Sequence, residues 1–157
     1  MNFSKYTLAS ALICIIASCQ TSTKQNDELI LDVTQVVNKT ANQVTKMLGE
    51  PDSTYTIRIL GNPIFCQLYQ PHSIEIQYHG SLATDIVVYG PHELPFNQLA
   101  LKSFNLDYKT HPDEFMKDRL MRWNSIDGFS TISFYNPTKD SLGNITSFNI
   151  FFKAKSK

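Results

Sequence analysis

The sequence predicts an α+β fold in which short helices pack on one face of an antiparallel meander sheet. Three observations lead to this prediction: a helical stretch with clear ends, a series of segments in which apolar and polar residues alternate, and turn residues between these segments. Alternation with a period of two is typical of strands that bury one face. Residues 28–157 are expected to form the globular part, either as one unit or as two tandem helix-plus-meander units, 28–90 and 91–157.

The helix with the clearest ends begins after Thr40. Thr40 and Gln43 fit a capping box, in which each side chain bonds the backbone of the other residue. The helix should end at Gly49, because glycine readily takes the left-handed conformation just past a helix end, and Pro51 cannot continue a helix. The preceding segment 28–33 is expected to be extended.

Six segments have the pattern of strands. They are residues 55–60, 64–69, 73–78, 85–89, 128–135 and 145–152. Residues 119–124 are ambiguous. An apolar stripe predicts a second helix over 96–104. Acidic residues after Thr110 predict the start of a third helix, with Phe115 and Met116 pointing inward.

The N-terminus has the features of an export signal. Lys5 precedes an apolar run over residues 8–17, and the run stops at Ser18-Cys19. An aliphatic residue, two small residues and a cysteine resemble the lipobox of bacterial lipoproteins. The resemblance implies that residues 1–18 are a signal peptide, that Cys19 is lipidated and acylated by palmitate-like chains, and that residues 19–27 are a polar tether. An ordinary signal peptide cut elsewhere is the main alternative. A membrane-spanning helix requires about 20 apolar residues, more than this run contains.

The lipid would determine where the protein resides. Two or three acyl chains on Cys19 would anchor the protein firmly in a membrane, since each CH₂ buried in the bilayer contributes about 0.8 kcal/mol to the free energy of membrane binding. Gln20 stands where an aspartate is associated with inner-membrane retention, so the lipoprotein resemblance favours the outer membrane. We therefore expect a lipid-anchored protein of the bacterial cell envelope that faces the periplasm.

The charge balance argues against nucleic acid as a partner. The chain has 14 basic and 14 acidic residues, so it lacks the basic field that attracts phosphate backbones. Three lysines near the C-terminus are interpreted as a solvated strand end. They are Lys153, Lys155 and Lys157.

The cysteines predict no disulfide within the mature chain. The sequence has three; Cys14 would leave with the signal and Cys19 would carry lipid, which leaves Cys66. Cys66 shares the strand parity of Ile64. It is therefore expected to be a buried small hydrophobic residue rather than a catalytic or redox thiol.

No motif indicates catalysis, a metal or a cofactor, so the chain is not expected to be an enzyme. Glu75 and Asp85 could face each other as paired carboxylates do in acid–base catalysis, but their place on the polar side of a half-exposed sheet favours a solvated surface. Nucleophile-elbow and phosphate-loop motifs are absent from the sequence. The four histidines fall at turns or element ends, without the i, i+4 spacing of a helical metal site. They are His72, His79, His92 and His111.

The helix end Leu48-Gly49-Glu50-Pro51-Asp52, followed by a meander and preceded by a lipobox and a polar tether, resembles the small outer-membrane lipoproteins of the SmpA/OmlA or BamE-like group. Their fold also resembles that of the β-lactamase inhibitor protein, which consists of two such units. The likeness covers residues 40–89. The second half departs from it, since residues 103–107 lack the Gly and Pro of the first helix end. The resemblance implies a protein-binding function, either as an accessory in outer-membrane protein assembly or as an inhibitor of another protein.

The expected function is that of a lipid-anchored module that docks an envelope protein through aromatic side chains, which concentrate binding energy at interfaces. One alternative is an inhibitor or immunity-type protein for a single enzyme, and another is a hydrolase with an unrecognised site. The candidate partner-binding residues are Tyr55, Tyr69, Tyr89, Tyr108 and Trp123. Core packing is the competing interpretation for each of them, and it is favoured for Trp123.

Overall fold

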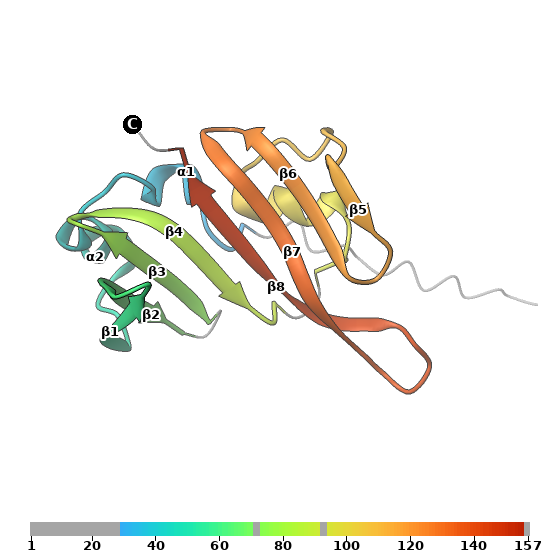
Figure 1. Cartoon of the computed structure of the whole chain (residues 1–157), viewed down its shortest axis with the longest axis horizontal. Helices are drawn as coiled ribbons and strands as arrows, with labels where there is room; N and C mark the ends of the chain where they lie inside the picture. The colour runs from blue at the N-terminus through green and yellow to red at the C-terminus, as the bar shows by residue number, and fades with distance from the viewer. Residues whose placement is uncertain (1–28, 71–72, 92–93, 156–157) are drawn as a thin grey trace, which may run out of the picture.

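The computed structural model describes residues 29–70, 73–91 and 94–155. These residues build one eight-stranded antiparallel sheet, and three short helical elements lie over one of its faces (Figure 1). The predicted α+β class is wrong, because the sheet dominates the fold. The helical elements have only four, eight and seven residues, too few to form a layer of their own.

The sheet consists of two four-stranded meanders joined edge to edge. The strand order is β1-β2-β3-β4-β8-β7-β6-β5, so the last strand of each meander pairs with that of the other. At this junction Val88 is the register partner of Ile150. The strands are β1 (Ser53–Ile59), β2 (Asn62–Tyr69), β3 (Ile74–His79), β4 (Leu82–Tyr89), β5 (Glu114–Met116), β6 (Leu120–Ile126), β7 (Phe129–Lys139) and β8 (Ile145–Ala154).

The helical elements are α1 (Val33–Val36), α2 (Ala41–Leu48) and the 3₁₀ helix η1 (Gln98–Phe104). The predicted capping box of α2 is confirmed: the Thr40 side chain accepts from the backbone N–H of Gln43, and the Gln43 side chain accepts from that of Thr40. Gly49 follows the last turn with a φ of 89°, a conformation that favours glycine.

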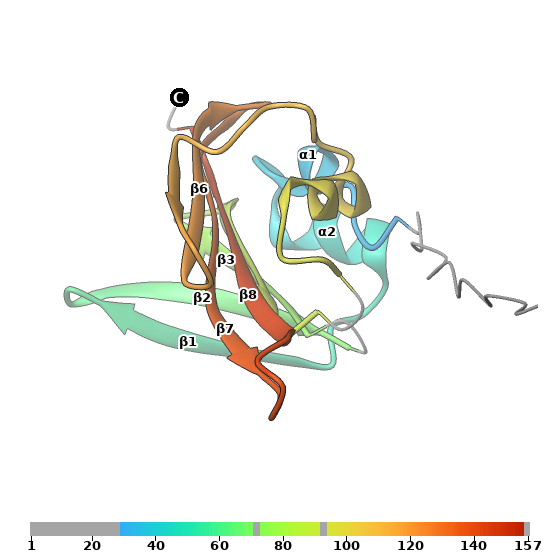
Figure 2. The same ribbon diagram turned by 90° about the vertical axis from the view of Figure 1, so that its right-hand side faces the viewer.

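The core lies between the helical elements and one face of the sheet, which we call the inner face (Figure 2). Aromatic rings fill much of it. The ring centroids of Phe104 and Phe152 are 5.0 Å apart, and those of Trp123 and Phe134 are also 5.0 Å apart. Such pairs contribute about 0.5–1.5 kcal/mol each beyond the burial of their area. The packing places the helical elements on the inner face and leaves the opposite face, the outer face, without a described helix.

Two local predictions were wrong. Residues 114–116 form β5 instead of a helix, and Phe115 and Met116 are exposed. The acids that suggested a helix start serve strand pairing: the Asp113 carboxylate accepts from the backbone N–H of Asn124 at 2.6 Å, and the Asp113 N–H donates to the carbonyl of Arg122 at 2.8 Å. The segment expected to be extended up to residue 33 instead starts α1 at Val33.

The residues of the expected signal peptide and tether, Cys14 and Cys19 among them, lie outside the described residues. Within the described part, none of the helices combines the length and apolar character needed to cross a membrane.

Candidate docking face

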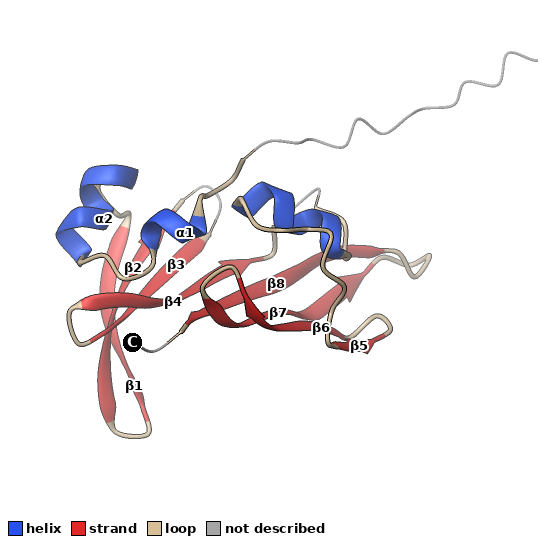
Figure 3. Ribbon diagram, turned by 90° about the horizontal axis from the view of Figure 1, so that it is seen from above, coloured by secondary structure: helices blue, strands red, loops and turns tan. Residues whose placement is uncertain are grey.

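The outer face carries buried polar groups at the centre of the sheet. Glu75, Gln77 and Asp85 are all more than nine-tenths buried, although alternation along β3 and β4 turns them away from the core. The prediction of solvated acids is therefore wrong. Figure 3 shows the β1–β2 hairpin bending away from the plane of β6–β8, on the side opposite the helices. This bend lets side chains of β1 cover those of β3.

Four of these side chains form what we call the tyrosine–glutamate cluster: Tyr55, Glu75, Gln77 and Tyr89. The Tyr55 hydroxyl donates to Oε2 of Glu75, and the Tyr89 hydroxyl donates to the same oxygen at 3.1 Å. Nε2 of Gln77 donates to the other oxygen, Oε1, at 2.6 Å. Both carboxylate oxygens are thus engaged. Charge-assisted bonds of this kind are stronger than neutral ones, so the cluster should be rigid.

Cys66 allows this cluster to form. It pairs with Tyr55 on β1 and with Gln77 on β3, so it lies beneath the path of the Tyr55 ring. A small side chain here lets the phenol reach across β2 to Glu75. The thiol is fully buried, as predicted. Burial, followed by the charge of Glu75, raises its pKa to about 11, so it is no activated nucleophile.

The two cluster tyrosines are protonated at neutral pH. For both of them burial is the largest cause that raises the pKa well above its usual value of 10.0, and the hydrogen bond to Glu75 and its charge add to the effect. Each hydroxyl proton is directed at Glu75, which leaves the phenol oxygen to accept a hydrogen bond from outside. Tyr55 is 37% exposed and Tyr89 is 41% exposed, so their outer edges are accessible.

The structure separates the other three candidate tyrosine and tryptophan residues from this cluster. Tyr69 is buried, and its hydroxyl donates to Gln67 at 3.3 Å. Tyr108 is partly buried, with the Lys102 ammonium 4.5 Å from its ring centroid. Trp123 is fully buried, and its indole N–H donates to the Thr110 carbonyl at 2.9 Å. Only Tyr55 and Tyr89 lie together on an accessible surface.

Sequence reasoning considered Glu75 only as a possible carboxylate pair with Asp85, and it did not consider Gln77 as a site residue. In the structure Asp85 is the register partner of Gln77, and Glu75 is that of Val87. Glu75 and Gln77 occupy the polar positions of β3, which the alternation assigned to solvent. A signal was present in the composition of the neighbouring strands, because Tyr55 on β1 and Tyr89 on β4 share the strand parity that turns them to the same face as Glu75. That signal is interpretable only once the pairing of β1 to β4 is known.

The hydrogen bonds of the cluster occupy the carboxylate of Glu75. A catalytic carboxylate needs an oxygen that can reach a substrate, whereas both oxygens of Glu75 are occupied by neighbouring side chains. Among the residues that the structure describes, no group of three or more His, Cys, Asp or Glu side chains could hold a metal ion. His79 and His111 belong to that part of the chain, while His72 and His92 lie outside it.

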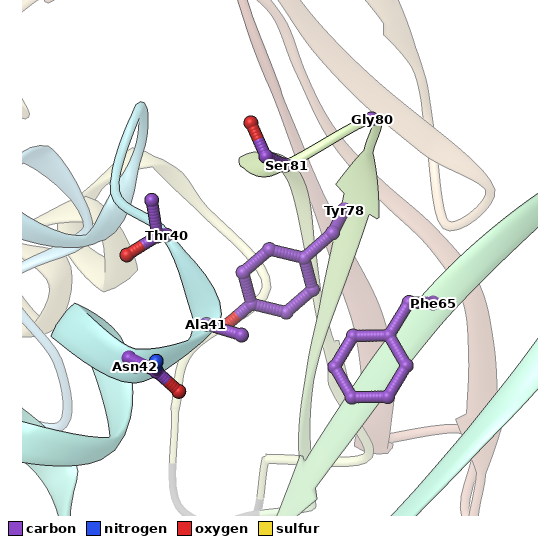
Figure 4. Close-up of a pocket in the computed structure, with 7 residues that line it drawn as sticks. All are labelled: Thr40, Ala41, Asn42, Phe65, Tyr78, Gly80 and Ser81. Atoms are coloured by element: carbon purple, nitrogen blue, oxygen red, sulfur yellow. The ribbon is translucent and has the colours of Figure 1, made fainter.

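A different cavity, of about 240 Å³, lies beside the start of α2 (Figure 4). The rings of Phe65 and Tyr78 line one side of it, with their centroids 5.6 Å apart. Thr40 lines the other side, and its capping box with Gln43 engages N–H groups that a free helix start would offer to an anion. Asn42 and Ser81 also line the cavity, so it combines two aromatic rings with small polar side chains.

None of the family models, curated proteins and solved structures with which the chain was compared matches it.

Proposed function

We propose that this chain is a lipid-anchored binding module of the bacterial cell envelope, which docks one partner protein on its outer face and catalyses no reaction itself. The observation that carries the proposal is the attachment of Tyr55 and Tyr89 to one carboxylate, that of Glu75.

Preorganisation is the physical reason why this attachment suits docking. Ordering a side chain on binding costs about 0.5–1.5 kcal/mol. Tyr55 and Tyr89 are already ordered by their bonds to Glu75, so little of this cost remains. Tyrosine is also enriched among the residues that dominate binding energy at interfaces.

The cluster also defines the chemistry of the partner. The phenol oxygens of Tyr55 and Tyr89 can accept hydrogen bonds, and Glu75 places a negative charge behind them. A partner segment that presents donors, such as an arginine side chain or backbone N–H groups, fits this surface best.

Lipidation of Cys19 would present the module to its partner at a membrane surface. The sequence pattern at residues 16–19 supports this part of the proposal, and the polar residues 19–27 would separate the lipid from the sheet. Replacing Cys19 by alanine should release the full chain from the membrane fraction. Retention of the variant in that fraction, or an unmodified N-terminus on the mature protein, would contradict the anchor.

In-cell crosslinking of the tagged full-length chain, followed by mass spectrometry, tests the docking proposal. One protein should be recovered reproducibly with the parent chain, and its recovery should fall with Tyr55→Ala and Tyr89→Ala. Met47→Ala is the matched control, because Met47 is an exposed apolar residue on α2. Equal recovery with all variants would refute the outer face as the docking surface.

The identity of the recovered protein separates the two binding functions. A component of outer-membrane assembly would indicate an accessory role. A single enzyme bound one to one would indicate an inhibitor or immunity-type protein, which uses the same surface.

A further inference from the structure

Strand β1 forms one edge of the sheet. In the described part of the chain β2 is the one strand that pairs with it, so the backbone N–H and C=O groups on its other side are open to a further strand. The pairing with β2 runs from Ser53 to Ile59 without a register shift. Figure 3 shows the β1–β2 hairpin extending away from the body of the molecule. The free side of β1 is therefore a regular edge at the periphery.

The composition of β1 leaves this edge unprotected. Natural proteins usually guard an exposed edge with proline, lysine, a bulge or a very short strand. β1 has seven residues, STYTIRI, with no proline and no lysine, and six of the seven are exposed. Most of them are β-branched or aromatic, which suits a strand. The strand at the opposite edge, β5, has only three residues, so β1 is the edge suited to pairing.

The sequence of β1 is complementary to itself in an antiparallel pair. When the pair is centred on Thr56, the whole strand overlaps, and Ser53 of one copy lies opposite Ile59 of the other. Tyr55 then lies opposite Ile57, and Thr56 lies opposite Thr56. Aromatic residues opposite β-branched ones, and threonines opposite each other, are favourable cross-strand pairs. Directly opposite residues point to the same face of the sheet, so the outer faces of the two copies would be continuous.

The charges of β1 agree with this arrangement. Arg58 is the single charged residue of the strand, and it is exposed. In the pair it lies opposite Thr54 of the other copy, with Asp52 of that copy as the next residue on the diagonal. Opposite charges at such positions stabilise a strand pair, whereas like charges destabilise it. The pair centred on Thr56 thus brings each arginine towards a carboxylate.

Neighbouring registers are less favourable. A pair centred on Ile57 would bring the two Arg58 side chains onto diagonal positions, where like charges repel. A pair centred on Tyr55 would place Ile59 opposite Pro51, which has no N–H to donate. It would also leave part of each strand without a strand partner. The pair centred on Thr56 avoids these costs.

We propose that two copies of this chain pair antiparallel through β1, centred on Thr56, so that their eight-stranded sheets join into one. The pair has two-fold symmetry and uses the same edge of both copies, so it closes as a dimer. The edges that remain are the short β5 strands. The proposal goes beyond the docking function and does not depend on it, because it requires no second protein.

Disulfide trapping of the full-length chain in detergent tests the register. Thr56→Cys places two cysteines opposite each other, where the Cα separation of about 4.5–5.5 Å in an antiparallel pair fits a disulfide. Thr54→Cys is the matched control, because Thr54 is also exposed but would face Arg58 of the other copy. Thr56→Cys should form the interchain disulfide at least about tenfold faster. The native Cys66 is buried, and peptide mapping identifies the bond at position 56.

A matched pair of charge substitutions tests the pairing without a covalent bond. Thr54→Glu places a carboxylate opposite Arg58 and should tighten the dimer about threefold or more. Thr56→Glu places two carboxylates opposite each other and should weaken the dimer about threefold or more. The two variants have the same net charge, and both positions are exposed. Sedimentation equilibrium in detergent measures the dissociation constant, which for the parent chain should lie below about 100 μM.

Three outcomes would overturn the proposal. A monomer at every concentration up to about 100 μM would mean that β1 stays unpaired. Equal disulfide rates for Thr56→Cys and Thr54→Cys, or a shift in the same direction for both glutamate variants, would place the contact on another surface or in another register. Assemblies larger than a dimer would indicate a contact that does not close.

Discussion

The hydroxyl of Tyr55 on β1 donates a hydrogen bond to the carboxylate of Glu75 on β3, across the intervening strand β2. The bond therefore joins strands that are not neighbours in the sheet. It closes the outer face over a buried charge, and it holds the β1–β2 hairpin in its bent position. The stability of the fold and the proposed docking surface thus involve the same pair of side chains.

The first prediction concerns the two phenol hydroxyls. Tyr55→Phe and Tyr89→Phe should each lower the free energy of unfolding by about 1–2 kcal/mol, because each removes a hydrogen bond to a charged group. The double variant should cost more than the sum of the two, since Glu75 then stays buried with Gln77 as its remaining donor in the cluster. Urea unfolding measures all three.

Tyr108→Phe is the control for this double-mutant cycle. The ring of Tyr108 packs beside Lys102, and phenylalanine retains that ring. The free energy of unfolding should therefore change by no more than about 0.5 kcal/mol. If the losses in free energy of unfolding from Tyr55→Phe and Tyr89→Phe are strictly additive or negligible, the two hydroxyls do not share the carboxylate of Glu75.

The second prediction concerns the reactivity of Cys66. Its pKa is raised from 9.0 to about 11, so at about pH 8 ionisation alone should slow alkylation about 100-fold, and burial should slow it further. Iodoacetamide labelling, mapped to the peptide that contains Cys66, should be slow in buffer and fast in urea. Rapid labelling of the folded chain would show that Tyr55 does not cover the thiol.

The third prediction concerns the pH dependence of stability at Asp85. Burial raises the pKa of this carboxyl above its usual 3.8, although His79 and Lys153 oppose the shift. The fold therefore favours the uncharged form, and the stability that this form contributes is lost as pH rises through the raised pKa. Asp85→Asn, which cannot ionise, should be more stable than the parent chain at about pH 7, and the difference should vanish below pH 3.8.

Urea unfolding at both pH values measures this difference. Asp118→Asn serves as the control for loss of a carboxylate, because Asp118 is a half-exposed partner of Lys139. If Asp85→Asn exceeds the parent chain in free energy of unfolding equally at both pH values, or more in acid, the fold does not favour the uncharged form of Asp85.

The fourth prediction separates Trp123 from the proposed docking residues Tyr55 and Tyr89. Trp123→Ala should lower the free energy of unfolding by about 3–5 kcal/mol, because it leaves a large cavity in the core. Trp123 is the single tryptophan of the chain, so circular dichroism must replace tryptophan fluorescence as the signal. A loss below about 1 kcal/mol would mean that the indole is not a core element.

Local patterns in the sequence predicted much of the secondary structure. The capping box at Thr40 and Gln43 is present, and the six expected strand segments correspond to β1, β2, β3, β4, β7 and β8. These features depend on neighbouring residues along the chain, so periodicity reveals them. The strand β6 stayed ambiguous, and β5 was mistaken for a helix, because Asp113 and Glu114 favour a helix start as readily as they satisfy a paired strand.

The candidate site depended on contacts that no local pattern contains. Glu75 is buried because Tyr55 reaches it over Cys66 from two strands away. Alternation placed Glu75 and Gln77 on one face of their strand, but the other strands that share this face are known only from the pairing, and whether the face is solvated is determined by the curvature of the sheet.

The most direct test of the proposed docking surface is in-cell photo-crosslinking of the full-length chain with a photoreactive amino acid at position 89, compared with the same amino acid at position 47 on α2. The proposal predicts one dominant adduct with a single protein from position 89 and little from position 47. No adduct from position 89, or the same adduct at equal yield from position 47, would contradict it.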